Sequence, residues 1–218
     1  TTALGWLEAL PQETLRANPD LCVYRAWFLV FTGHFPEAIA WIGQLTARAA
    51  ELPRPLAGLL AGIQGWMVTA AGQRMDLPRL LEAYAMTEGR FPYFAPMMLL
   101  AIGQAQREAG DLQDALGSYE AGIQLAEISS GPVSALILRN NKAFLLEEMG
   151  QRQVAAQMCR DTMDRYSSAD GKPGLLAGIP MLPLGCFLYR SGELEEAYAV
   201  LTQGINLVRR MGLYDILT

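Results

Sequence analysis

Histidine and cysteine are scarce in this sequence. Its 218 residues include one histidine, His34, and three cysteines, Cys22, Cys159 and Cys186. A single histidine all but excludes a Ser-His-Asp triad and a histidine-rich metal site. His34 follows Gly33, so we interpret it as a solvated turn residue, with a general base as the alternative. The cysteines are odd in number and far apart, which favours buried thiols of a cytoplasmic protein over a disulfide framework.

Charge is also low, and basic charge is the lower of the two signs. Charged residues make up 18% of the chain, with 17 basic against 22 acidic side chains and a net charge of −5. The only adjacent basic pair is Arg209-Arg210. Because nucleic-acid binding needs many Lys and Arg side chains against phosphates, we expect no direct nucleic acid binding by this segment.

Long hydrophobic runs are missing as well. The charge-free stretches Gly58–Gly72 and Leu175–Tyr189 are shorter than the roughly 20 residues that span a bilayer. We expect them to be buried helices and expect no membrane contact. The hydrophobic content of 51% excludes a disordered chain and suits extended helix–helix faces or a large interaction surface.

What the sequence does contain is an internal repeat. A turn glycine followed by a helix start recurs at intervals of 39, 38, 40 and 42 residues. Glycine tolerates the left-handed backbone conformation that closes a tight turn after a helix. A period of about 40 residues with helical patterning indicates a two-helix unit. The five glycines are Gly33, Gly72, Gly110, Gly150 and Gly192.

Small residues keep register with these glycines. Alanine stands five residues after four of them, and a glycine or alanine stands seven residues before all five. A small residue on each helix lets two helix backbones approach closely, so the pattern predicts tightly packed helical hairpins. The alanines are Ala38, Ala115, Ala155 and Ala197, and the earlier small residues are Ala26, Gly65, Gly103, Ala143 and Gly185.

The second hairpin departs from this pattern. Leu77 stands where alanine is expected, but a shift of the second helix by three residues aligns Asp76 with Asp111. We therefore predict a turn three residues longer in this hairpin. Leu80 then takes the place of the small alanine, and the packing is expected to be looser.

The predicted fold class is all-α, with about five hairpins after short helices within 2–10 and 11–17. We expect the whole of 1–218 to form a single repeat domain. The hairpin helices are expected at about 19–32 and 35–50, 55–71 and 76–88, 93–109 and 112–127, 132–149 and 151–166, and 174–191 and 193–211.

Convergent polar groups of the kind that catalysis requires are missing, so we expect no enzyme. Glu147-Glu148 is a pair of carboxylates, but adjacent helix residues diverge by about 100 degrees, and we interpret the pair as a solvated helix face. Met97-Met98 is expected in the core, with contact to a partner as the alternative. The sequence has no Gly-rich phosphate loop, and no cofactor is expected in this segment.

The repeats resemble the tetratricopeptide consensus, in which an aromatic residue follows the small alanine by four positions, as Tyr119 follows Ala115. Two stretches further resemble the helical-repeat sensor segment of MalT-like regulators of the LuxR family. One stretch is Asn18-Pro19-Asp20-Leu21 with Arg25-Ala26-Trp27, and the other is Gly192-Glu193-Leu194-Glu195-Glu196-Ala197.

The resemblance implies a right-handed α-α superhelix in a cytoplasmic bacterial regulator. It also implies an ATP-binding module before the repeats and a DNA-binding helix-turn-helix after them. We therefore expect the chain to be a fragment of a longer regulator. It would contact the other domains of that regulator and bind a small-molecule inducer or a protein or peptide partner. A stand-alone repeat scaffold for protein–protein interaction is the alternative.

The binding surface is expected on the concave side, which the first helix of each hairpin lines in arrays of this type. Trp27 and Trp66 each follow a small packing residue, where core packing and a groove-lining role both stay open. Residues three and four positions away share this face. We expect Arg107 and Glu147 to pair when the groove is empty. The predicted groove residues are Trp27, Trp66, Gln104, Arg107, Asn140, Phe144, Glu147 and Tyr189.

Overall fold

The computed structural model describes residues 3–70 and 76–211. Within them the backbone forms twelve α-helices, and the only strand-like pairing is an isolated bridge between Ser167 and Pro173. Contacts between residues divide the chain into two compact units, Thr1–Ala105 (unit 1) and Gln106–Thr218 (unit 2). None of the helices in the described part of the chain is long and apolar enough to cross a membrane.

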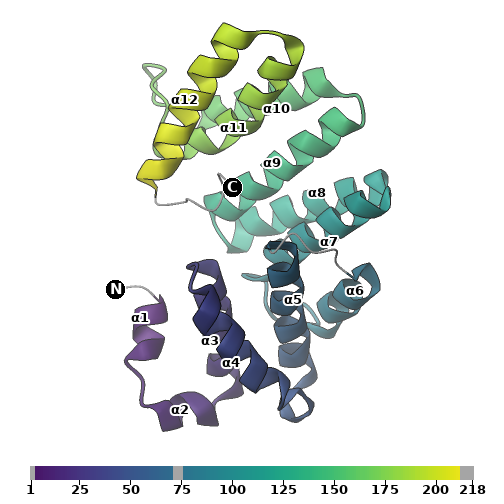
Figure 1. Ribbon diagram of the computed structural model, residues 1–218, viewed down its shortest axis with the longest axis vertical. Coiled ribbons are helices and arrows are strands. Elements are labelled where there is room, and N and C mark those ends of the chain that lie inside the picture. Colours follow the sequence, from purple (N-terminus) through teal and green to yellow (C-terminus); the bar gives the residue numbers. More distant parts are fainter. Residues whose placement is uncertain (1–2, 71–75, 212–218) are drawn as a thin grey trace. The chain divides into compact units, whose positions relative to one another are not determined.

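Unit 1 contains two short helices and two helical hairpins, drawn in purple and blue in Figure 1. The first hairpin begins at Pro19 because the Asn18 side chain accepts hydrogen bonds from the backbone N–H groups of Asp20 and Leu21. α7 begins in this unit and ends in the next. The elements are α1 (Ala3–Glu8), α2 (Gln12–Ala17), α3 (Pro19–Phe31), α4 (Phe35–Thr46), α5 (Arg54–Ala70), α6 (Leu77–Met86) and α7 (Ala95–Ala109), with a 3-10 turn at Ala49–Glu51.

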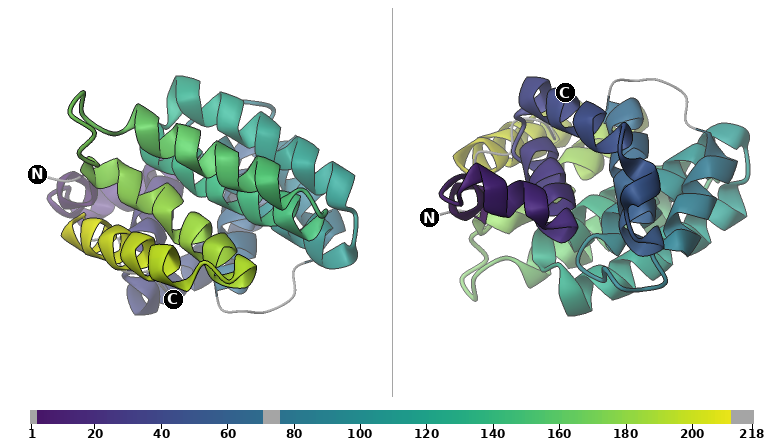
Figure 2. Two further views of the ribbon diagram at one scale, coloured as in Figure 1. Left: turned by 90° about the horizontal axis from the view of Figure 1, so that it is seen from above. Right: turned by 90° about the horizontal axis from the view of Figure 1, so that it is seen from below.

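Unit 2 continues the same plan. Each helix contacts the next along the chain from α8 to α12, and Figure 2 shows these helices lying side by side. α11 begins at Gly178 and not near residue 174, because a 3-10 turn at Leu175–Ala177 precedes it. The elements are α8 (Leu112–Ser129), α9 (Pro132–Glu148), α10 (Arg152–Arg165), α11 (Gly178–Ser191) and α12 (Leu194–Arg210).

The predicted turn glycines close the hairpins. The φ angles of Gly33, Gly110, Gly150 and Gly192 are 78°, 89°, 80° and 84°, in the left-handed region. In each turn the residue after the glycine donates its backbone N–H to the carbonyl five residues before it, as in the bond from Asp111 to Gln106 of 2.9 Å. This is the bond that satisfies an otherwise orphan carbonyl at a helix end. Gly72 lies outside the described residues.

The predicted small alanines of the second helices are buried. Ala38, Ala115 and Ala155 have no exposed surface, and Ala197 is 2% exposed. Tyr119, at the aromatic position of the consensus, is also fully buried. The register read from the sequence is therefore confirmed in four hairpins.

The second hairpin has the predicted shift. α5 ends at Ala70 and α6 begins at Leu77, directly after Asp76, as α8 begins directly after Asp111. Leu80 is buried in the place of the small alanine. A Cβ added at Gly58 would lie 2.6 Å from the Ala83 carbonyl oxygen, so the two helices approach closely there.

Nearer the turn, the helices of this hairpin separate. A hollow of about 220 Å³ lies between them, lined by Ala61, Gln64, Gly65, Val68, Asp76, Arg79 and Leu80. Because the leucine replaces a small residue, it holds the helices apart at this end. The looser packing predicted for the hairpin is thus present at its turn end and absent at Gly58.

The remaining core predictions are confirmed except at Cys186, which was expected to be buried. Met97 and Met98 are buried, and all three cysteines are free thiols, with Cys22 and Cys159 buried and Cys186 half-buried. Burial raises the pKa of the Cys159 thiol to about 12. His34 is an exposed turn residue whose ring lies 2.9 Å from the Thr32 hydroxyl.

Candidate partner-binding site

The predicted groove residues of unit 1 differ in their burial. Trp27 is 4% exposed, and its ring meets the Phe94 ring edge-on with 4.9 Å between the centroids. Because the Trp27 side chain is almost fully buried, a partner cannot contact it, and Trp27 is a core residue of this unit. Trp66 and Gln104 are half-buried.

In unit 2, two predicted residues occupy different surroundings. Asn140 of α9 is half-buried, and its side-chain amide donates a hydrogen bond of 2.9 Å to the Ile179 carbonyl oxygen of α11. It therefore ties two helices together. Tyr189 of α11 is 64% exposed and can meet a partner without any rearrangement of the core.

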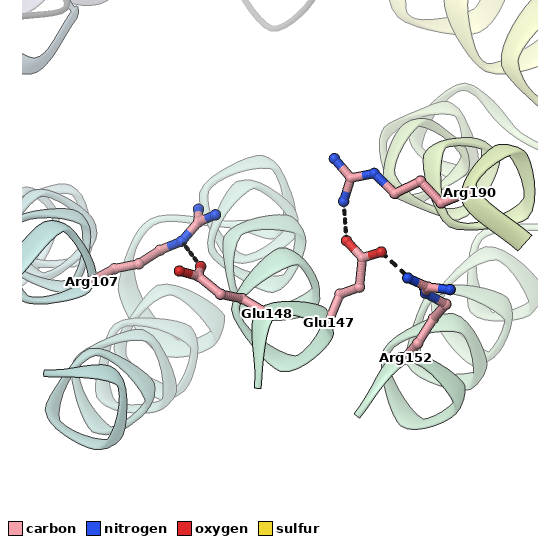
Figure 3. A network of polar contacts seen from close by, with 5 residues as sticks. All are labelled: Arg107, Glu147, Glu148, Arg152 and Arg190. Carbon is pink, nitrogen blue, oxygen red and sulfur yellow. Dashed lines mark hydrogen bonds and ion pairs between the residues drawn. The ribbon is translucent and has the colours of Figure 1, made fainter. Parts of the chain in front are cut away.

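Three predicted residues, Arg107, Phe144 and Glu147, line one polar hollow of about 350 Å³ in unit 2. Their helices are α7 and α9, and α10 and α11 complete the hollow. The other three side chains that line it are Glu148, Arg152 and Arg190. We refer to these six residues as the arginine hollow. Figure 3 shows its five charged members.

The charged members pair in a way that differs from the prediction. Arg107 Nε lies 2.5 Å from a carboxylate oxygen of Glu148, not of Glu147. Glu147 instead pairs with Arg152 Nε at 3.1 Å through one oxygen and with Arg190 through the other (Figure 3). Successive helix residues diverge by about 100 degrees, so the two carboxylates face different neighbouring helices. The predicted Arg107–Glu147 pair was wrong.

The interpretation of Glu147-Glu148 as a solvated face was wrong for Glu147. Its side chain is only 6% exposed, whereas those of Arg152 and Arg190 are 47% and 54% exposed. The carboxylate thus lies beneath two guanidinium groups that reach solvent. A covered carboxylate needs paired donors to offset the loss of water, and the two arginines provide them.

The aromatic member of the hollow, Phe144, is half-buried. Its ring meets the Phe187 ring edge-on with 5.5 Å between the centroids, within the apolar core shared by α9, α10, α11 and α12. One part of Phe144 therefore packs inward, and the part that lines the hollow offers an apolar contact beside the charges.

The sequence contained a signal for the members that were missed. Glu148 and Arg190 both stand two residues before a turn glycine, Gly150 and Gly192. This position is next to the predicted groove position, which stands three residues before the turn glycine at the same end of the helix. Arg152 follows Gly150 at the start of a second helix, which the groove prediction did not include.

A second, more open hollow of about 770 Å³ lies elsewhere in unit 2. Three charged residues line it: Lys142 and Glu120 pair with each other at 2.7 Å, and Asp161 accepts a hydrogen bond of 2.7 Å from the Gln157 amide. Leu116, Leu146, Val154 and Met158 supply its apolar part. None of the predicted groove residues lines it.

No protein-family model matches the sequence, and no curated protein matches it. Solved structures do. Two crystal structures of kinesin light chain-like TPR-like repeats from Podosopora anserina match with TM-scores of 0.59 and 0.58. Both are 18% identical, covering 91% of this chain and 96% of theirs. BtubC (BKLC) from P. vanneervenii matches with a TM-score of 0.55 at 14% identity, covering 98% of this chain and 94% of its own.

The fold is that of tetratricopeptide-like repeats. The predicted all-α fold of hairpin repeats is thereby confirmed. Sequence identities this low concern the fold alone, so the resemblance to LuxR-family regulators stays a prediction.

Proposed function

We propose that this chain is the ligand- or partner-binding repeat segment of a MalT-like transcription regulator of the LuxR family. The observation that carries the proposal is the arginine hollow. Its residues come from the first helices of three successive hairpins, α7, α9 and α11, together with the start of α10. A ligand in this hollow would contact three repeats at once.

Such a position suits a sensor. Repeats in an array of this type contact mainly their neighbours, so the stability of the array depends on the interfaces between them. A ligand that bridges three hairpins adds binding energy to two of these interfaces. It would therefore favour the arrangement of the hairpins that it binds most tightly. The size of the shift depends on how much its affinity differs between the arrangements.

The residue types support binding over catalysis. Arginine, glutamate and phenylalanine recognise charge and shape, and Glu147 is already committed to two guanidinium groups. We propose that the segment needs no cofactor of its own. In the proposed regulator, ATP and DNA would be bound by modules on either side of it, and this segment would make no direct contact with nucleic acid.

A stand-alone scaffold for protein partners is the second candidate. The similarity to solved kinesin light chain-like repeats favours it, because these structures share the hairpin architecture over most of the chain. The two candidates agree that the repeats bind a partner and differ in what surrounds them.

The coding sequence on either side of this segment separates the candidates. The regulator requires a phosphate-binding loop with Gly-Lys-Ser/Thr before the repeats and a helix-turn-helix after them. If a full-length gene product carried neither module, the regulator would be excluded and the scaffold favoured. If both are present, reporter transcription by the full-length protein should change when Arg190 is replaced by glutamine.

A further inference from the structure

The arginine hollow carries an excess of positive charge in an acidic chain. Three arginines and two glutamates line it, whereas the chain as a whole has a net charge of −5. The net charge of the chain repels anions at long range, whereas the three arginines attract them at short range. A hollow of this composition selects for a negatively charged group.

The two glutamates are not equivalent. Glu147 is 6% exposed and holds Arg152 and Arg190, so it acts as a fixed part of the wall. Glu148 is 43% exposed, and the Arg107 side chain that it meets is 36% exposed. Ion pairs open to solvent to this extent contribute little to stability, because water and salt compete with them. The Glu148 carboxylate can therefore be exchanged for another.

The guanidinium groups are placed to receive such a group. Figure 3 shows that Arg107 and Arg190 extend toward each other above α9 from opposite sides. A guanidinium carries five N–H donors in a rigid fork that fits a carboxylate. Each of the three arginines uses one nitrogen for its closest contact with a glutamate, so donors are left for a ligand.

We propose that the arginine hollow binds a ligand that carries carboxylate groups, through Arg107 and Arg190. Glu148 occupies the place of the ligand carboxylate when the hollow is empty, and Phe144 contacts the apolar part of the ligand. This inference rests on the proposed binding function and names its ligand class. The carboxylates belong to acidic side chains of a peptide or to a small polycarboxylate, which share this chemistry.

Direct binding measurements test the proposal with two probes, a blocked hexaglutamate peptide and citrate. Isothermal titration calorimetry at low and fixed ionic strength should detect binding of at least one probe to the wild-type chain. Arg107→Gln with Arg190→Gln should weaken that binding by at least about tenfold, because two charge-assisted contacts are lost. A blocked hexalysine peptide should not bind at this site.

Glu148→Gln is the decisive variant. Because it removes the internal competitor of the ligand, it should tighten binding by up to about fivefold, the size expected for an exposed ion pair. If the pair merely holds helices together, this variant would leave binding unchanged or weaken it. Arg165→Gln is the matched control, since Arg165 is an exposed arginine of unit 2 outside the hollow, 3.8 Å from Glu127.

The binding results distinguish the two sources of the carboxylate groups. Binding of the peptide alone assigns the acidic side chains of a partner, and binding of citrate alone assigns a small polycarboxylate. The proposal is overturned if neither probe binds, if Arg165→Gln weakens binding as much as the double variant, or if Glu148→Gln fails to tighten it. If the full-length gene product carries the flanking regulator modules but neither probe binds, this inference is wrong and the proposed function still holds. Circular dichroism checks that each variant is folded. If the double variant does not fold, the single variant Arg107→Gln is measured in its place.

Discussion

Glu147 and Glu148 are consecutive residues of α9, yet their carboxylates bind arginines of different helices. Glu148 pairs with Arg107 of α7, and Glu147 pairs with Arg152 of α10 and with Arg190 of α11. One end of α9 is therefore linked by charge to the helices on both of its sides.

Replacement of Glu147 should destabilise unit 2 more than replacement of Glu148. In Glu147→Gln a covered amide meets two guanidinium groups, and its NH₂ group repels one of them. The expected loss is about 1–3 kcal/mol, the cost of leaving buried polar groups poorly paired. Glu148→Gln should cost at most about 1 kcal/mol, because its pair is exposed to solvent. Urea denaturation followed by circular dichroism compares the two, and equal midpoints would contradict the burial difference.

Ala115→Leu should destabilise the chain. Ala115 has no exposed surface, so a larger side chain overpacks its surroundings at a cost of about 1–3 kcal/mol. Ala121→Leu on the same helix is the control, because Ala121 is exposed and should tolerate leucine. A denaturation midpoint that moves equally little in both variants would disprove the predicted hairpin register.

Two glycines near each other in the chain should respond to alanine in opposite ways. An added Cβ at Gly110 or Gly117 meets nothing within 4 Å, so no clash occurs at either place. Gly110 has a φ of 89°, where alanine is strained by about 1–2 kcal/mol. Gly117 lies inside α8, where alanine favours the helix by roughly 0.5–1 kcal/mol. Thermal melts should therefore shift down for Gly110→Ala and up for Gly117→Ala.

The Cys159 thiol should resist alkylation in the folded chain. Burial raises its pKa from 9.0 to about 12, so the reactive thiolate is rare at neutral pH. Since the raised pKa favours the neutral form in the folded state, this contribution to stability is complete below pH 9 and is lost as the pH rises toward about 12. Mass spectrometry after iodoacetamide treatment at pH 8 should find Cys186, which is half-buried, labelled before Cys159. Labelling of Cys159 first would contradict its burial.

The hairpins could be predicted from the sequence because their determinants are local. A glycine such as Gly110 fixes the turn, and Ala115 five residues later fixes the side of the helix that faces its partner. Even the shifted hairpin followed from Asp76, which caps α6 by accepting a hydrogen bond from the Arg79 N–H. Each of these features depends on a few neighbouring residues.

The site could be predicted only in part, because its pairs depend on side-chain directions between helices. Helical spacing placed Arg107 and Glu147 on one face, but it does not decide which of two consecutive carboxylates the arginine reaches. The burial of Trp27 could not be predicted from helical spacing either. Its partner Phe94 directly precedes α7, and the helical spacing does not show that this ring would cover Trp27.

The links from α9 to α11 have a consequence for how unit 2 opens. Besides the pair of Glu147 with Arg190, the Asn140 amide binds the Ile179 carbonyl oxygen, so the two helices are joined at two points. In an array whose units interact only with their neighbours, stronger coupling between two units makes them unfold together. The last two hairpins should therefore behave as one cooperative foldon, with amide protons of α9 and α11 exchanging at similar rates.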